Sequence, residues 1–296
     1  MNNIVDILEV GLRDGLQNVK ENLSIKDRLF IIEGLIEAGL SKIQVASFVD
    51  PKRVPQMAFA EDLVKRLNKK NGVEYSGLVF NVRGVERALN CKLNKVETSI
   101  SINERYSNKN LGMSVSESMI NLKAIIKLAR KNSMKIRAGI QCVWGYDVKD
   151  DYNQIAVIEH LKKIVGMGVN RISFCDTPGM ANPKRISVLL DEVLSLFPDL
   201  EISIHLHNTN GLGLVNLFKA LEFGIKEIDT SLGGIGGSPF IKKSKGNIAT
   251  EDVAYLMESM GYDIGLDIKK ISDLSNYLEK KIGSQYFGGK IYKLIR

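Results

Sequence analysis

Short apolar runs rich in β-forming residues alternate with longer amphipathic runs along the chain, and the alternation repeats eight times. Apolar runs of this length and composition predict strands. The predicted strands are Ile4–Val10, Lys42–Phe48, Glu74–Phe80, Lys95–Ile102, Lys135–Trp144, Arg171–Asp176, Glu201–His207 and Glu227–Leu232.

The amphipathic runs between these strands carry apolar residues at helical spacing. In the first run, Ile25, Leu29 and Ile32 fall on one face of a helix. Glycine follows several runs, as Gly39 does here, and glycine is a common helix stop. The helices predicted in this way are Ser24–Ala38, Ser114–Asn132, Tyr152–Met167, Pro183–Phe197, Leu212–Phe223 and Thr250–Met260.

Strands that alternate with helices imply a parallel sheet. Eight repeats within 296 residues, with no linker or low-complexity stretch, predict an α/β fold of the closed (β/α)₈ TIM-barrel type. We expect the barrel to span residues 1–265, with residues 266–296 as a short C-terminal helical extension packed on it. A doubly wound sheet is the alternative, because periodicity cannot show closure.

The glycine pattern argues against a dinucleotide-binding sheet. No Gly-x-Gly-x-x-Gly string follows the first strand, and the cluster Gly233–Gly237 at the eighth strand lacks the paired downstream acid. We expect this cluster to form a loop at the barrel mouth, where backbone amides could hold an anion.

Composition narrows the class of protein. The hydrophobic share of 44% and charged share of 25% are typical of globular proteins, and no apolar run approaches the ~18–20 residues of a membrane span. No signal peptide is evident, and three widely spaced cysteines indicate reduced thiols in a cytoplasmic protein. The net charge of +7 is spread among acids, with few interleaved aromatics, so no nucleic-acid or membrane partner is expected.

Two of the three histidines, His205 and His207, end the seventh predicted strand two residues apart, so both face the same side. The carboxyl ends of barrel strands share one face, which also receives Arg13 and Asp14 after the first strand and Asn247 after the eighth. A single histidine is usually structural, but this pair lies opposite a carboxylate. One carboxylate, two imidazoles and an amide oxygen suit a divalent cation, Mg²⁺ or Mn²⁺ first and Co²⁺ or Zn²⁺ second.

Other polar residues lie at the same end. Gln44 and Ser47 belong to the second strand, and Asp176 and Thr177 end the sixth. We assign Arg13 a catalytic role in stabilising an oxyanion, with a structural ion pair as the alternative. For Asp176, a substrate-binding role and the capping of the next loop are equally open. Cys175 is expected to be a small buried side chain.

Several longer strings contain these residues: LEVGLRDGLQN, ASFVDPKRVPQM, FCDTPG, IHLHNTNG and GGIGGSPFIKKSKGNIATED. Together they resemble the 3-hydroxy-3-methylglutaryl-CoA lyase branch of the metal-dependent lyase/aldolase barrels, over about Val5 to Gly261. The resemblance implies a carbon–carbon lyase that cleaves an anionic 3-hydroxy-acyl substrate, with acyl-CoA as a candidate, by a retro-aldol or retro-Claisen reaction. It is also consistent with a homodimer.

The resemblance further implies roles for individual residues. A divalent metal would be held by Asp14, His205, His207 and Asn247. Arg13 would stabilise the enolate, and Gln17 would line the substrate pocket.

Three positions depart from that family. Ser238 stands where the lyases have a loop cysteine, Gln44 replaces a glutamate, and CVWGYDVKDD replaces a G-C-P-x-x-G string. A thiol, with a pKa near ~8.5, delivers a proton far more readily than a hydroxyl. The changes fall in the pocket while the metal ligands are kept, so we predict a retained metal with altered substrate or chemistry, in which Ser238 and Gln44 occupy catalytic positions.

The lysine-rich segment after Ser238 suggests how an anionic substrate is bound. Lys242 and Lys243 would cover a CoA phosphate, a sugar acid or an oligocarboxylate, and the alternative is a solvated loop. Cys142, at the end of the fifth strand, is a hypothetical replacement for the missing acid. Two other functions stay open: an aldol- or Claisen-type condensing enzyme, and a degenerate barrel that binds metal and ligand without turnover.

Overall fold

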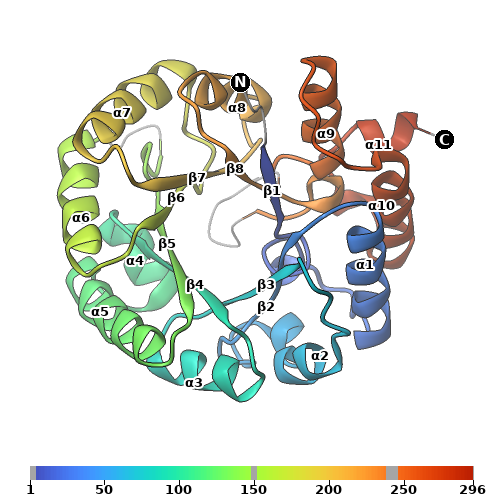
Figure 1. The fold of residues 1–296 in the computed structure, drawn as a ribbon, viewed down its shortest axis with the longest axis horizontal. Helices are drawn as coiled ribbons and strands as arrows, with labels where there is room; N and C mark the ends of the chain where they lie inside the picture. Colours follow the sequence, from blue (N-terminus) through green and yellow to red (C-terminus); the bar gives the residue numbers. More distant parts are fainter. Residues whose placement is uncertain (1–4, 148–151, 238–245, 296) are drawn as a thin grey trace.

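The computed structural model describes residues 5–147, 152–237 and 246–295. Within these residues eight parallel strands close into a barrel in the order β1 to β8 (Figure 1). The strands are β1 (Asp6–Glu9), β2 (Lys42–Ser47), β3 (Glu74–Leu78), β4 (Lys95–Ser101), β5 (Lys135–Gln141), β6 (Arg171–Asp176), β7 (Glu201–Leu206) and β8 (Glu227–Thr230). Because β1 pairs with both β2 and β8, the sheet has no edge. The (β/α)₈ prediction is confirmed, and the doubly wound alternative is excluded.

The predicted strands are right in number and order, but all except the sixth extend too far at their carboxyl ends. The fifth prediction ran to Trp144, whereas β5 ends at Gln141 because Cys142 takes a φ of 60° and turns the chain. Apolar residues continue beyond the strand because the turn itself is buried: Val143 and Trp144 are fully covered. Buried residues therefore continue along the chain beyond the end of the strand.

Helices surround the barrel, and the six predicted ones are present. They are α1 (Ile25–Glu37), α5 (Val115–Lys131), α6 (Gln154–Gly166), α7 (Pro183–Leu196), α8 (Gly213–Glu222) and α9 (Thr250–Ser259). Local signals fix their starts: the Ser24 hydroxyl accepts from the backbone N–H of Asp27, which returns the contact in a capping box. No helix of the described residues is long and apolar enough to cross a membrane.

The sequence did not predict three of the helices: α2 (Ala60–Arg66), α3 (Val82–Asn90) and α4 (Glu104–Leu111). Each is short, and α4 buries only Tyr106 and Ser107, so its apolar periodicity is weak. Helices as short as these depend on tertiary packing for their stability.

The C-terminal end is helical, with α10 (Ile268–Ile282) and α11 (Ile291–Leu294). Helix α10 lies beside α1 (Figure 1), and Gly34 of α1 permits this approach, since a Cβ there would lie 2.7 Å from Leu274. The Ser275 hydroxyl on α10 also hydrogen-bonds Glu251 on α9. The extension therefore packs on the first and last helices of the barrel.

The alternating side-chain directions along β7 determine which of its residues face the barrel interior. Ile202, Ile204 and Leu206 are buried apolar residues, whereas Ser203 and His205 are buried polar residues at the alternate positions. Ser203 accepts a hydrogen bond from Arg137 on β5, so this polar set faces the barrel interior. The interior is consequently polar from its amino-terminal end up to the level of the histidines.

Candidate metal centre and active site

Three predicted ligands converge at the carboxyl end of the barrel. One ligand atom from each of Asp14, His205 and His207 lies within 4.8 Å of the other two. The Nε2 atoms of the histidines are 3.2 Å apart, and Asp14 Oδ2 lies 3.9 Å from His205 Nε2 and 4.0 Å from His207 Nε2. All three residues are buried.

A tight turn after β1 brings Asp14 to this position. The carbonyl of Val10 accepts from the backbone N–H groups of Arg13 at 3.0 Å and Asp14 at 2.7 Å, and the 3₁₀ helix η1 (Gly15–Asn18) follows. The chain therefore turns directly after β1, which places the Asp14 carboxylate beside the two histidines.

Asn247 reaches the same point from the other end of the chain. Its backbone pairs with His207 in an isolated bridge, and its Nδ2 donates to Asp14 Oδ2 at 2.9 Å and to the Ile235 carbonyl at 3.0 Å. Its Oδ1 is buried and has no hydrogen-bond partner among the described residues. A buried amide oxygen without a donor is a candidate metal ligand.

The electrostatics suit a cation. Burial alone would raise the pKa of Asp14, but Arg13 and the two histidines outweigh it and hold that pKa well below its usual range. Burial lowers the pKa of His207 to about 4. An ionised carboxylate beside a neutral imidazole is the protonation state that metal binding requires. Two imidazole nitrogens, a carboxylate oxygen and an amide oxygen thus form a donor set that fits a divalent cation.

Arg13 is fixed beside this cluster. Its Nη1 donates to Asp14 Oδ1 and its Nε donates to the side-chain oxygen of Gln44, which is buried on β2. Gln17 Nε2 also donates to Asp14 Oδ1, at 3.3 Å. Arg13 Nη2 has no hydrogen-bond partner among the described residues, so one edge of the guanidinium remains available to a ligand.

These groups line one cavity of about 580 Å³. One part of its wall is apolar, with Phe48, Met57 and Leu78, and another carries hydroxyls and amides such as Ser47 and Gln141. The sequence predictions missed several residues of this wall: Arg53, Glu97, Asn110, Arg137, Gln141 and Asp229. A charged residue inside a predicted strand is a detectable signal, because such residues are buried only with a partner. Glu97, Arg137 and Asp229 all carry that signal.

The Asp176 side chain makes the hydrogen bonds of a loop cap, one of the two roles that the sequence left open. It is fully buried and does not line the cavity, and its Oδ1 accepts from the backbone N–H groups of Met180 at 2.7 Å and Ala181 at 3.0 Å. Burial raises the pKa of Asp176 to about 7. The next residue, Thr177, faces the cavity instead.

Two cysteines, Cys142 and Cys175, lie in other surroundings than the sequence predicted. Cys142 is buried, does not line the cavity, and burial raises its pKa to about 12, so the geometry argues against Cys142 as the acid. Cys175 was expected to be buried, but it is half-buried and lines the cavity. It faces inward because it pairs with His205 in the sheet register.

The glycine-rich segment lies at the barrel mouth as predicted, beside Asp14 and Asn247. Gly236 has a φ of +129°, and a Cβ there would lie 2.4 Å from Asn247 Nδ2. The Gly237 carbonyl accepts from the side chain of Asn18. Ser238, Lys242 and Lys243 lie outside the described residues.

Comparison with known proteins shows which family the chain resembles. A family model described as HMGL-like matches residues 4–278. The chain is 37% identical over 279 residues to the hydroxymethylglutaryl-CoA lyase of Bacillus subtilis, covering 94% of this chain and 93% of the relative. It is 35% identical over 274 residues to the mitochondrial hydroxymethylglutaryl-CoA lyase of Homo sapiens, covering 93% and 84%.

Solved structures agree with these sequence matches. The crystal structure of the Bacillus subtilis HMG-CoA lyase superposes with a TM-score of 0.94 at 35% identity, covering 99% of this chain and 98% of that one. An HMG-CoA lyase from Acinetobacter baumannii, in complex with coenzyme A and 3-methylmalate, gives a TM-score of 0.90 at 28% identity, covering 96% and 94%.

Proposed function

The chain belongs to the HMGL-like family and is a carbon–carbon lyase, and on this premise we propose that it cleaves 3-hydroxy-3-methylglutaryl-CoA or a related anionic 3-hydroxy-acyl substrate. The observation that carries the proposal is the convergence of Asp14, His205 and His207 beside Arg13 in one cavity. The relative solved with coenzyme A and 3-methylmalate supports a substrate that combines an acyl-CoA with a hydroxy acid.

Asp14, His205, His207 and Asn247 would hold the metal, with Mg²⁺ or Mn²⁺ as first choice and Co²⁺ or Zn²⁺ as alternatives. Bound there, a divalent cation supplies Lewis acidity to the substrate's hydroxyl and neighbouring carbonyl oxygens. The unpartnered Oδ1 of Asn247 supports its inclusion among the ligands.

The reaction breaks the bond between the carbon that carries the hydroxyl and its neighbour next to the thioester. The hydroxyl proton passes to water, the alcohol carbon becomes a ketone, and the electrons of the broken carbon–carbon bond pass to the departing enolate. Arg13 stabilises the enolate oxygen through Nη2, because its other contacts, to Asp14 and Gln44, hold the guanidinium in place. Protonation of the enolate carbon then completes acetoacetate and acetyl-CoA.

The final proton requires an acid. We assign this position to Ser238, with Gln44 holding Arg13 in the orientation that the enolate needs. Gly237, which precedes Ser238 in the chain, contacts Asn18 on the cavity wall. Lys242 and Lys243 would bind the anionic part of the substrate. We also place the protein in the cytoplasm, which its free thiols support, while a homodimer stays a prediction.

The test incubates Mn²⁺- or Mg²⁺-loaded protein with 3-hydroxy-3-methylglutaryl-CoA, beside an Asp14→Ala control. We expect acetoacetate and acetyl-CoA in equal amounts from the unaltered protein only. No product from protein that demonstrably holds metal would reject this substrate. Consumption of acetyl-CoA with a keto acid would then identify a condensing enzyme, and tight acyl-CoA binding without turnover would identify a degenerate barrel.

A further inference from the structure

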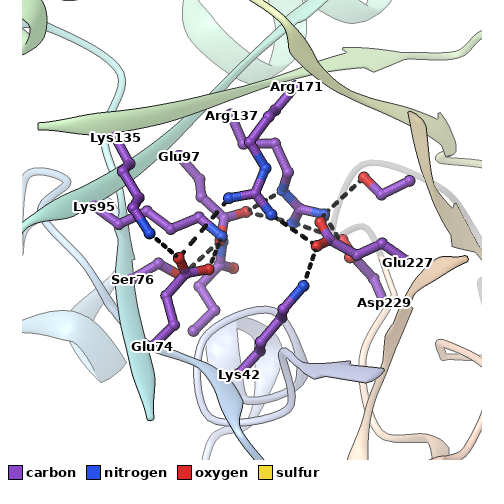
Figure 2. A network of polar contacts seen from close by, with 12 residues as sticks. Lys42, Glu74, Ser76, Lys95, Glu97, Lys135, Arg137, Arg171, Glu227 and Asp229 are labelled. Carbon is purple, nitrogen blue, oxygen red and sulfur yellow. Dashed lines mark hydrogen bonds and ion pairs between the residues drawn. The ribbon is translucent and has the colours of Figure 1, made fainter. Parts of the chain in front are cut away.

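Arg137 spans the barrel interior at the wall of the cavity and joins carboxylates on the opposite strands β4 and β8 (Figure 2). On one side, its Nη1 and Nη2 donate to the two carboxylate oxygens of Asp229 on β8, at 2.7 and 2.9 Å. On the other side, its Nε donates to Glu97 Oε2 on β4 at 2.9 Å. All three residues are at most 3% exposed.

Asp229 connects this bridge to the proposed metal centre. Its Oδ2 lies 3.2 Å from Nδ1 of His205. Both oxygens of Asp229 accept from the Arg137 guanidinium, the two-pronged arrangement typical of an arginine–carboxylate pair. A carboxylate at this position accepts from Nδ1 of His205, which keeps the ring proton on Nδ1 and leaves the Nε2 lone pair facing His207 and Asp14.

The guanidinium of Arg137 has little freedom to move. Nη1 also donates to the Ser203 hydroxyl at 2.8 Å, and Nη2 also donates to Glu97. Glu97 is held in turn by the Ser76 hydroxyl at 2.6 Å and lies 4.0 Å from the ammonium of Lys95. Because the planar guanidinium is hydrogen-bonded on both sides, it cannot rotate without breaking several charged hydrogen bonds. A change in the position of Glu97 therefore alters the position of Asp229.

Three carboxylates surround this guanidinium: Glu97, Asp229 and Glu227, whose Oε1 lies 3.4 Å from Nη1. Asp229 is the one shared with the histidine, because its Oδ2 contacts both Nη2 of Arg137 and Nδ1 of His205.

We propose that Glu97, Arg137 and Asp229 form a positioning chain that fixes the tautomer and ring orientation of His205. The proposal rests on the proposed function, because it makes His205 Nε2 the ligand atom. Asp229 acts on His205 directly, and Glu97 acts on it through Arg137.

The first test reads the tautomer in metal-free protein. With only three histidines in the chain, long-range ¹H–¹⁵N spectra of histidine-labelled protein give few ring signals, which His205→Gln and His207→Gln assign. The unaltered protein should show His205 protonated on Nδ1. Asp229→Asn and Glu97→Gln should raise the fraction protonated on Nε2, in that order of effect. A tautomer that stays unchanged in both variants would overturn the proposal.

The second test measures Mn²⁺ affinity by counting free Mn²⁺ with electron paramagnetic resonance. Loss of a group that orients a ligand weakens metal binding by about 10–100-fold, which we expect for Asp229→Asn. Glu97→Gln and Arg137→Lys should give smaller losses. Glu74→Gln is the control, because Glu74 is half-buried in the same network of charges and pairs with Lys95. Within the described part of the chain it has no contact with Arg137 or Asp229 (Figure 2).

The outcomes separate the two proposals. If unaltered protein binds no Mn²⁺ but the tautomer shifts as described, the proposed function fails and the positioning chain stands. Equal Mn²⁺ affinities in the unaltered protein and in folded Glu97→Gln and Arg137→Lys reject the chain, even if Asp229→Asn does not fold. A loss in Glu74→Gln equal to that in Glu97→Gln would also reject it, since the effect would then be general destabilisation.

Discussion

The side-chain amide of Asn247 donates to Asp14 Oδ2 at 2.9 Å across 233 positions of sequence. Asp14 follows β1 and Asn247 lies beyond β8, so this contact lies across the seam where the barrel closes. The proposed metal centre therefore exists only in the closed barrel, and its ligands depend on contacts that cross the seam.

Replacing Asp14 with alanine should abolish the stabilisation that a divalent cation gives. A cation that binds only the folded protein raises the free energy of unfolding by about 2.7 kcal/mol at 100 times its dissociation constant. Thermal unfolding with and without Mn²⁺ measures this gain. Asp62→Ala, on the exposed side of α2, should retain the whole shift, and a full shift in Asp14→Ala would rule out the proposed ligand set.

Replacing Arg13 with methionine should lower kcat by about 10²–10³-fold, as expected for loss of a group that stabilises an oxyanion. Gln44→Ala should cost less, because it frees the guanidinium at Nε but leaves the charge. Steady-state kinetics compares both with Arg66→Met, an exposed arginine on α2. A change confined to KM in Arg13→Met would mean that Arg13 binds substrate without stabilising the enolate.

Replacing Ser238 with cysteine should raise kcat for 3-hydroxy-3-methylglutaryl-CoA. A thiol with a pKa near ~8.5 gives up its proton far more readily than a hydroxyl at neutral pH. Product formation under saturating substrate and metal measures the effect. An unchanged or lower kcat, with metal binding intact, would show that Ser238 does not occupy the position of the acid.

Gly236→Ala should displace Asn247 and weaken Mn²⁺ binding while the barrel stays folded. The added Cβ would lie 2.4 Å from Asn247 Nδ2, closer than any side chain tolerates. Gly224→Ala is the control, since Gly224 also has a positive φ, of +78°, but has open space around it. Mn²⁺ titration of both variants separates the effect of the Cβ contact with Asn247 from the effect of backbone strain. A Mn²⁺ affinity in Gly236→Ala equal to that of the unaltered protein would show that Asn247 is not a ligand.

Glu251 should make the protein less stable as the pH rises from about 5 to 8. Burial raises its pKa from the ordinary 4.5 to about 8, so the folded state holds a proton that the unfolded state has released. The stabilising contribution is complete below the unfolded pKa and is lost as the pH rises through the folded one. Urea unfolding across this range should show a flatter profile for Glu251→Gln, because glutamine mimics the protonated acid. Glu258→Gln, at an exposed site on α9, should keep the slope of the unaltered protein, and an equal slope in Glu251→Gln would assign the pH dependence elsewhere.

The elements that the sequence predicted share one property: their signal lies within a few residues. The two-residue spacing of His205 and His207, the position of Arg13 and Asp14 directly after the first strand, and the helical spacing of apolar residues after Ser24 are all local. Strand order and the grouping of candidate ligands at one end then followed from the barrel prediction.

By itself, the sequence determined the eight strands, six of the surrounding helices and which residues were candidate metal ligands, because period and spacing are properties of neighbouring positions. Only the tertiary structure decided that β1 pairs with β8, that Asp176 caps a loop, and that Arg137 joins Glu97 to Asp229. These depend on which distant residues the closed barrel brings into contact. A buried charge shows in the sequence that a partner exists, and the closed barrel determines which residue that partner is.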